Sequence, residues 1–165
     1  MLTKAELKEY LNYDPDTGEF NWIKKKSNRT KLFIKIGYLE LNGNLRIEFG
    51  GKKYLSHRLA WLYMTGEWPK YVIDHVNGNP SDNRWCNLRD VTHQINMHNR
   101  RKSQSNSKLK TIGVSFYKAN DSYTAQIVVN KKKIHLGYFK DKSKAHQAYL
   151  NAKKIYHPSF VENPL

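Results

Sequence analysis

A polar, basic stretch in the second half of the chain sets the strongest limit on how it can fold. Residues 100–110 read RRKSQSNSKLK, with one apolar side chain in eleven. A segment without apolar periodicity has nothing to bury in a core, so it is typical of a solvated linker or of an ordered segment that contacts DNA. At 165 residues, the chain is then expected to form two small domains. We place a linker at 102–110, between domains over 1–101 and 111–165.

Charge is unevenly divided between these parts. The whole chain carries 29 Lys and Arg against 14 Asp and Glu, a formal net charge of +15. Residues 1–100 hold a balance of +5 and residues 101–165 a balance of +10. This excess favours a polyanionic partner, with nucleic acid as the first expectation. Ribosomal, membrane-surface and heparin-binding proteins share such a charge, so composition alone leaves the partner open.

Other features exclude several classes of protein. A single cysteine, Cys86, allows neither a disulfide framework nor a Cys-rich zinc site, and favours a reducing interior. The N-terminal residues are charged throughout and lack the apolar core of a signal peptide. No apolar run approaches the length of about 20 residues that crosses a bilayer. We therefore expect a soluble cytoplasmic protein with no membrane partner.

Local patterns predict short elements that supply a core to the first part. The capping box TKAE at residues 3–6 predicts a helix that opens the chain, and the DPDTG run after it favours turns. The alternating runs GYLEL, LRIEF and KKYLS, joined by NGN and GGK, indicate hairpins. SHRLAWLYMTGEWP is typical of a helix that Ser56 caps and Gly66 ends, with His57 in a structural role.

The stretch YVIDHVNGNPSDNRWCNLRDV places Asp74 and His75 at the end of an apolar run. Strand, loop, strand and a helix from near Thr92 are predicted in that order. Phosphodiester hydrolysis needs a proton acceptor that works near neutral pH, which an imidazole provides. It also needs a hard cation, for which Asp74 and the amide oxygen of Asn96 are suitable ligands. The alternative is a hairpin whose polar side chains only satisfy one another.

The spacing of Asp74-His75, Asn87 and Asn96 resembles the ββα-metal fold of HNH nucleases, and NGNPSDNRWCNLR resembles their phage homing-endonuclease branch. The resemblance implies that His75 is the general base and that Asp74 and Asn96 bind one divalent ion. Mg²⁺ is expected, with Mn²⁺ as the alternative. It implies that Asn87 holds the loop and the base in place. Where many members carry a further His one turn later, this chain has Arg100.

Three β-like runs and one helix are predicted in the second part. The runs lie near 112–117, 122–129 and 133–139, and the helix has an apolar stripe of Ala145, Ala148, Tyr149, Ala152 and Ile155. A sheet covered by one helix buries one face. If Ala125 and Ile127 pack on the helix, strand alternation points Thr124, Gln126 and Val128 outward, with Lys133 and His135 beside them.

The motifs GV, YTAQI and LGYF and the Ala-rich helix are similar to the plant Apetala or ethylene-response-factor DNA-binding domain, over about residues 111–160. The similarity implies three antiparallel strands docked in a major groove. Where the plant pattern has Arg after Gly-Val and Trp before Leu-Gly, this chain has Ser115 and His135. Its sequence preference therefore does not carry over.

Together these features predict an α+β chain, a ββα-metal nuclease domain with N-terminal hairpins followed by a three-stranded sheet packed on one helix. The predicted function is metal-dependent cleavage of double-stranded DNA, of homing type in a phage-infected bacterial cell, by a monomer or weak dimer without a protein partner. A non-catalytic DNA-binding regulator and an RNA-binding or ribosomal protein are the alternatives. The predicted DNA contacts are Arg84, Arg89, Arg100, Arg101, Tyr117, Lys118, Tyr123, Gln126, Lys131, Lys133 and His135.

Overall fold

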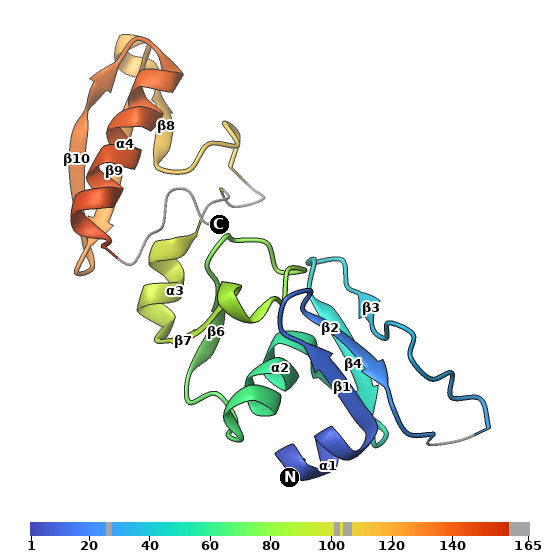
Figure 1. The fold of residues 1–165 in the computed structure, drawn as a ribbon. Helices are drawn as coiled ribbons and strands as arrows, with labels where there is room; N and C mark the ends of the chain where they lie inside the picture. The colour runs from blue at the N-terminus through green and yellow to red at the C-terminus, as the bar shows by residue number, and fades with distance from the viewer. Residues whose placement is uncertain (26–27, 101–102, 104–106, 159–165) are drawn as a thin grey trace. The chain divides into compact units, whose positions relative to one another are not determined.

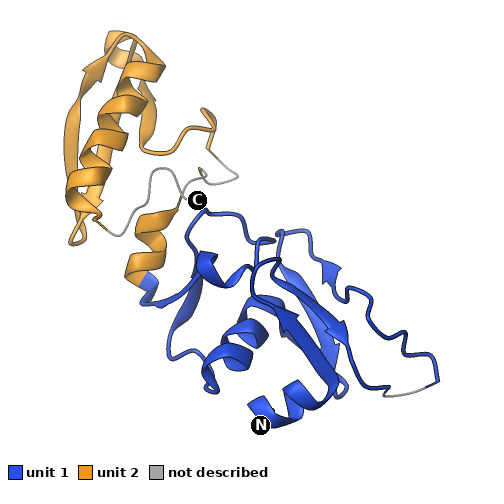
Figure 2. Cartoon of the chain, in the orientation of Figure 1, with its two compact units in different colours: residues 1–93 blue, residues 94–165 orange. Residues whose placement is uncertain are grey.

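The computed structural model shows a mixed α/β chain in which small antiparallel sheets combine with helices, as the sequence predicted. The chain divides into two compact units, residues 1–93 and 94–165 (Figure 2). This boundary lies before the expected linker at 102–110, part of which is outside the described residues, so the linker stays a prediction. The described residues are 1–25, 28–100, 103 and 107–158.

Figure 1 shows the order of the elements along the chain. The first unit contains α1 (Lys4–Tyr10), β1 (Leu11–Asp14), β2 (Glu19–Trp22), β3 (Tyr38–Leu39), β4 (Leu45–Phe49), β5 (Lys52–Leu55), α2 (Ser56–Thr65), β6 (Val72–His75), the 3₁₀ turn η1 (Trp85–Asn87) and β7 (Leu88–Val91). Helix α3 (His93–Asn99) begins at the boundary. The second unit continues with β8 (Val114–Tyr117), the 3₁₀ turn η2 (Lys118–Asn120), β9 (Ser122–Val129), β10 (Lys132–Phe139) and α4 (Lys142–Tyr156).

The capping box that opens the chain is confirmed. Thr3 Oγ1 accepts a hydrogen bond from the Glu6 N–H, and Glu6 Oε2 accepts one from the Thr3 N–H at 2.8 Å. These two bonds satisfy free donors of the first turn. They fix α1 so that Leu7 points into the core, where it is fully buried.

An antiparallel hairpin of β1 and β2 follows, although the sequence indicated only its turn. Asp14 closes that turn, because its backbone oxygen accepts from the Gly18 N–H at 2.8 Å. Gly18 has φ 75°, and a Cβ built there would lie 2.4 Å from the backbone carbon of Asn83. The turn therefore packs directly against the chain that follows β6.

Strands β3, β4 and β5 form the expected hairpins, and β5 runs straight into α2. Gly66 ends α2 in a left-handed conformation, as predicted. The expectation that Ser56 caps α2 is wrong. Leu55 holds the N-cap position, and Ser56 is the first helical residue, with its hydroxyl buried and without a hydrogen-bond partner.

The core of the first unit lies between α1, α2 and the strands. Tyr13 and Phe20 pack their rings 4.8 Å apart across the β1–β2 hairpin. Because β6 and β7 contribute Ile73 and Leu88 to the same cluster, the core extends to the strands that carry the Asp-His pair. The buried apolar members are Leu7, Leu11, Tyr13, Phe20, Ile47, Leu59, Ala60, Leu62, Ile73 and Leu88.

The second unit contains a sheet in the order β10-β9-β8, covered on one face by α4 (Figure 1). Ala125 and Ile127 face the helix and are buried, as predicted. Four members of the predicted helix stripe pack inward to different degrees, but Ile155 is 73% exposed. It lies in the last turn of α4, and its place on the apolar stripe was therefore a wrong prediction.

The backbone of Gly113 is in contact with the ring of Tyr149 on α4. Gly113 has φ 75°, and a Cβ built there would lie 2.0 Å from that ring. We predict that Gly113→Ala destabilises the second unit by about 1–3 kcal/mol through displacement of the ring, with about 1 kcal/mol added by the left-handed backbone. Hydrogen exchange of the β9 amides in the full chain measures the loss.

Gly50→Ala is the matched control, because Gly50 also has positive φ while no atom lies within 4 Å of its added Cβ. Gly50→Ala should lower the free energy of unfolding of the first unit by only about 1 kcal/mol, the contribution of the left-handed backbone. Unaltered β9 protection in Gly113→Ala would contradict the packing described.

His57 in the first turn of α2 is 7% exposed, in agreement with the predicted structural role. Burial, followed by electrostatic interactions with His75 and Arg58, lowers its pKa to about 3. Below pH 6.5 the side chain of His57 therefore binds a proton in the unfolded chain but not in the folded chain. Since the unfolded state then binds more protons, the free energy of unfolding falls as the pH falls.

We predict that wild type loses about 1.4 kcal/mol of unfolding free energy per pH unit below 6.5 at this residue. His57→Gln should show a shallower loss, because its side chain does not titrate. Denaturant unfolding between pH 7.5 and 5, followed by tryptophan fluorescence, measures the difference, since all four tryptophans lie in residues 1–93. Parallel curves for the two proteins would argue against a buried neutral His57.

Candidate functional site

The loop between β6 and β7 is shaped by asparagine side chains that hydrogen-bond to nearby backbone. Asn77 Oδ1 accepts from the N–H of Asn79 at 2.8 Å, and Asn79 Oδ1 accepts from the N–H of Ser81 at 3.2 Å. Gly78 turns the chain just after the strand with φ 70°. Such local bonds are the reason that Asn favours turns. The polar loop therefore has a defined conformation.

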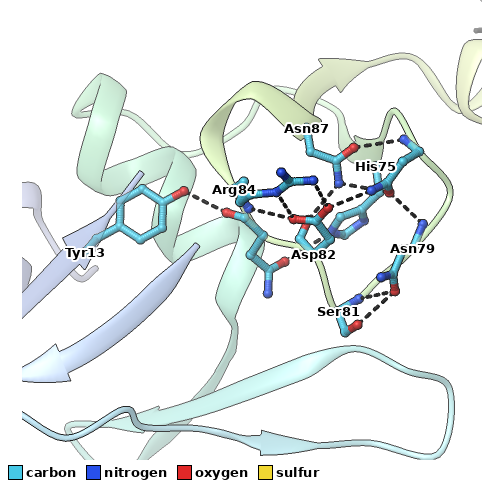
Figure 3. Close-up of polar contacts among 9 residues, drawn as sticks. Tyr13, His75, Asn79, Ser81, Asp82, Arg84 and Asn87 are labelled. Carbon is cyan, nitrogen blue, oxygen red and sulfur yellow. Dashed lines mark hydrogen bonds and ion pairs between the residues drawn. The ribbon is translucent and has the colours of Figure 1, made fainter. Parts of the chain in front are cut away.

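Asn87 ties this loop together at its base. Its Oδ1 accepts from the Asn77 N–H at 2.9 Å, and its Nδ2 donates to the backbone oxygen of Asp82 at 2.7 Å and to Asn77 Oδ1 at 3.0 Å (Figure 3). Asn87 is 5% exposed. The organising role expected of Asn87 requires such contacts; its effect on catalysis stays a prediction.

Asp74 lies near the end of β6, buried and opposite Arg89 on β7. Arg89 Nε donates to Asp74 Oδ2 at 2.9 Å, and Arg89 Nη2 lies 2.7 Å from the same oxygen. The cross-strand register brings these charges together. Arg89 was expected to contact DNA phosphates, but in this structure its guanidinium is held by Asp74.

His75 follows on the same strand and is also buried. Its Nε2 lies 3.0 Å from Asn83 Oδ1, and its ring meets the ring of His57 edge-on, with centroids 5.1 Å apart. Burial lowers the pKa of His75, and the Asn83 hydrogen bond and the charges of Asp74 and Asp82 oppose that shift in part. The imidazole is therefore neutral at neutral pH, the form that can accept a proton.

Arg84 forms a two-pronged ion pair with Asp82 in the same loop. Its Nε and Nη2 donate to the two carboxylate oxygens at 2.8 and 2.6 Å (Figure 3). This pairing is the largest cause of the lowered pKa of Asp82. Arg84 is more than one-third exposed, so a phosphate could approach it, but the carboxylate already occupies its donor edge.

Two of the predicted site residues belong to α3 and its end. Asn96 is half-buried on α3, and Arg100 follows it; the backbone oxygen of Arg100 accepts from Lys153 Nζ at 2.6 Å. Asn96 belongs to the second compact unit, so a shared metal site with Asp74 stays a prediction. Arg101 lies outside the described residues.

The donor chemistry of the predicted ligands fits a hard divalent ion. Asp74 offers a carboxylate and Asn96 an amide oxygen, the ligand types that Mg²⁺ prefers. Within the described part of the chain, no three His, Cys, Asp or Glu side chains gather as a metal site. The residues therefore fit an ion that has few protein ligands and completes its shell with water and substrate oxygens.

The outer face of the second sheet carries polar and aromatic side chains. Lys133 and His135 are exposed on β10, opposite Val128 and Gln126 of β9. His135 Nδ1 lies 3.2 Å from the hydroxyl of Thr124. Strand alternation therefore places Gln126, Lys133 and His135, three of the predicted DNA contacts, on one face, as expected. Lys118 and Lys131 are exposed beyond the strand ends.

The sequence predicted only part of the aromatic side chains on the outer face of this sheet. Tyr117 is exposed and lies with its ring 5.3 Å from Tyr138, a residue that the sequence analysis missed. A register shift between His135 and Gly137 brings Tyr138 to the outer face, and the alternation pattern gave no sign of it. Tyr123 instead packs against the inner apolar cluster, so it does not share the outer face.

A pocket of about 210 Å³ adjoins one end of this face. Gln126 and Ser115 from the sheet line it together with Arg100 and further hydroxyl side chains. Two of the predicted DNA contacts, Arg100 and Gln126, therefore border one polar pocket. Its donors suit a phosphate or a base edge.

The helices in the described part of the chain are all too short or too polar to cross a membrane. Comparison with curated proteins gave no match. A solved structure of the HNH homing endonuclease I-HmuI, reported for its DNA binding and cleavage, is similar with 29% identity and a TM-score of 0.42, over 55% of this chain and 51% of that chain. The chain thus spans about half the length of that enzyme.

The family model for HNH endonucleases matches residues 54–98. The matched segment begins in β5, includes α2 and the β6–β7 hairpin, and ends in α3. It contains Asp74, His75, Asn87 and Asn96, the four residues on which the sequence resemblance was based. Over this segment the chain is similar to the HNH endonucleases.

Proposed function

We propose that the protein is a metal-dependent DNA endonuclease of homing type, in which His75 is the general base. The observation that carries the proposal is the placement of a buried, neutral imidazole beside a carboxylate at a strand end, within the segment that matches the HNH endonucleases. The net charge of +15 supports a nucleic-acid substrate.

In the proposed reaction His75 accepts a proton from the attacking water. Loss of that proton leaves a hydroxide-like oxygen to attack phosphorus, and the 3′ or 5′ oxygen leaves on the opposite side. Asn87 keeps the loop closed around His75 by its three hydrogen bonds. The base is therefore held in place before substrate binds, which lowers the entropic part of the barrier.

Asp74, together with Asn96, would hold a divalent ion, with Mg²⁺ proposed first and Mn²⁺ second. When bound, such an ion neutralises charge on the phosphate and on the leaving oxygen. The guanidinium of Arg89 donates a hydrogen bond to Oδ2 of Asp74 and adds a positive charge to the same region. Arg89 compensates the buried carboxylate of Asp74 in the free protein by pairing with it across the strands.

The second unit is proposed to choose the position on duplex DNA. Its outer face presents Gln126, Lys133 and His135, side chains that can bond to base edges or phosphates in a major groove. The similarity to the Apetala or ethylene-response-factor domain supports this orientation. Residues 101–165 also carry +10 of the net charge, which supplies attraction that does not depend on sequence.

Incubation of supercoiled plasmid with the full chain, with and without Mg²⁺ or Mn²⁺, tests the proposal. Open circles would demonstrate nicking, and linear product would demonstrate cleavage of both strands. Binding without any cleavage in either ion would contradict the proposal and favour a DNA-binding regulator. Preference for RNA over duplex DNA at matched salt would favour an RNA-binding protein.

We predict that His75→Ala lowers the cleavage rate by about 10²–10⁴-fold while DNA affinity changes little. The change removes the proton acceptor and no net charge at neutral pH. Single-turnover cleavage and a binding titration in the same buffer measure the two effects, with tryptophan fluorescence as the test of folding. Wild-type cleavage by the folded variant would remove His75 from the proposed role.

We predict that Lys133→Gln on the sheet face lowers the log–log salt slope of DNA binding by about 0.9, the value for one lost phosphate contact. Lys144→Gln is the matched control, because Lys144 is exposed on α4, which covers the other face of the sheet. Binding titrations across a range of KCl concentrations compare the two. Equal slopes would show that the outer face is not the DNA-binding face.

A further inference from the structure

Asn83 is the hydrogen-bond partner of His75, yet the sequence analysis gave it no role. Its Oδ1 lies 3.0 Å from His75 Nε2, and the residue is 2% exposed. Asn83 stands eight positions after His75, on the far side of the loop. A contact between the two side chains therefore depends on the fold of the whole loop.

Contacts from outside the loop hold the backbone of Asn83. The Tyr13 hydroxyl donates to the Asn83 backbone oxygen at 2.7 Å in a buried position (Figure 3). Gly18 packs so closely that an added Cβ would lie 2.4 Å from the Asn83 backbone carbon. The Trp85 N–H donates to the Pro15 oxygen at 2.9 Å. The β1–β2 hairpin thus fixes Asn83 from a part of the chain about 70 residues away.

Hydrogen bonding at one ring nitrogen decides which nitrogen of a neutral histidine can act as a base. A neutral imidazole has one N–H donor and one acceptor nitrogen. An amide oxygen only accepts, so Asn83 Oδ1 requires the proton of His75 to lie on Nε2. In that tautomer Nδ1 carries the lone pair and is the acceptor nitrogen. The edge-on ring of His57 packs against the same imidazole and limits its rotation.

We propose that Asn83 is a positioning residue that keeps the proton of His75 on Nε2 and so makes Nδ1 the atom that accepts the proton of water. The β1–β2 hairpin is part of this device, because it holds the backbone of Asn83. The inference rests on the proposed role of His75 as general base. It adds a residue, a tautomer and a supporting hairpin to that role.

The protonated nitrogen can be measured without any reaction. Nitrogen-15 chemical shifts of His75 in the labelled full chain distinguish the two tautomers at neutral pH. We expect the Nε2–H form in wild type and in Asn83→Asp, whose carboxylate also accepts. In Asn83→Leu we expect a mixture of the tautomers. A wild-type His75 protonated on Nδ1 would overturn the inference directly.

Cleavage kinetics give a second, independent readout. We expect Asn83→Leu to lower kcat by about 10²–10⁴-fold, the range for loss of general-base catalysis, with KM near the wild-type value. Asn83→Asp should restore most of kcat because it restores the acceptor. Loss of the correct tautomer is known to have effects of this size in a histidine-dependent hydrolase. Equal kcat in Asn83→Leu and wild type would overturn the inference.

Asn79→Ala is the matched control within the same loop. Asn79 Oδ1 accepts hydrogen bonds from the N–H and the hydroxyl of Ser81, so its loss weakens the turn without removing the partner of His75. Its nitrogen-15 signature should match wild type. If Asn83→Leu does not fold, Tyr13→Phe replaces it, because that change removes the hydroxyl that holds the Asn83 backbone. A wild-type signature and a wild-type kcat in Tyr13→Phe would contradict the role of the hairpin.

The experiments separate this inference from the proposed function. An active His75→Ala would refute the general-base role, whatever the tautomer. An inactive His75→Ala, together with unaltered kcat in folded Asn83→Leu, would keep His75 as the base and reject Asn83 as its positioning residue.

Discussion

The packing of two N-terminal hairpin turns against the β6–β7 loop is the constraint on which the candidate site depends. Gly18 approaches Asn83 so closely that any side chain would displace the loop, and a Cβ on Gly43 would lie 2.9 Å from Pro80. A loop this polar has little apolar surface of its own to bury, so it needs outside support. The hairpins supply that support, and the side chains of the loop then hold His75 in one place.

Opposing electrostatic effects meet at the end of β6. Burial lowers the pKa of His75, while the Asn83 hydrogen bond and the charges of Asp74 and Asp82 oppose that shift in part. Asp74 has the guanidinium of Arg89 across the strand pair, and His75 has a neutral amide, Asn83, as its partner. The buried carboxylate of Asp74 therefore has a cationic partner, and the buried imidazole beside it has a neutral one. Two adjacent residues thus have the different partners that the proposed roles of metal ligand and general base call for.

Elements with a strong local pattern were predictable from the sequence. The capping box of α1, the β4–β5 hairpin, the glycine end of α2 and the alternation of β9 all depend on neighbours along the chain. The misplaced details concern the ends of helices, which local pattern locates least well. Ser56 is the first residue of α2 and not its cap, and Ile155 is exposed in the last turn of α4. No local signal marks such outcomes.

The same limit applies to the candidate site. Local pattern and the resemblance to HNH nucleases together singled out Asp74, His75 and Asn87 as candidates, because they lie on one hairpin whose strand ends are recognisable. The pairing of Arg89 with Asp74 could have been found from the hairpin register, since the two residues are directly opposite. Asn83 could not, because its position is set by Tyr13 and Gly18 in a hairpin that the sequence had indicated only as a turn.

The polar residues of the two units are arranged differently, buried around His75 in the first unit and exposed on the outer sheet face in the second. Around His75, polar side chains are buried and bonded to one another, and they hold the imidazole in one orientation, as the proposed general base requires. On the outer sheet face, Lys133, His135 and Tyr138 are exposed and accessible to solvent. Rigidity at the first place and accessibility at the second are separable properties. Substitutions on the sheet face should therefore leave the hydrogen bonds that hold His75 unchanged, and under the proposed function they should alter where and how tightly DNA is bound.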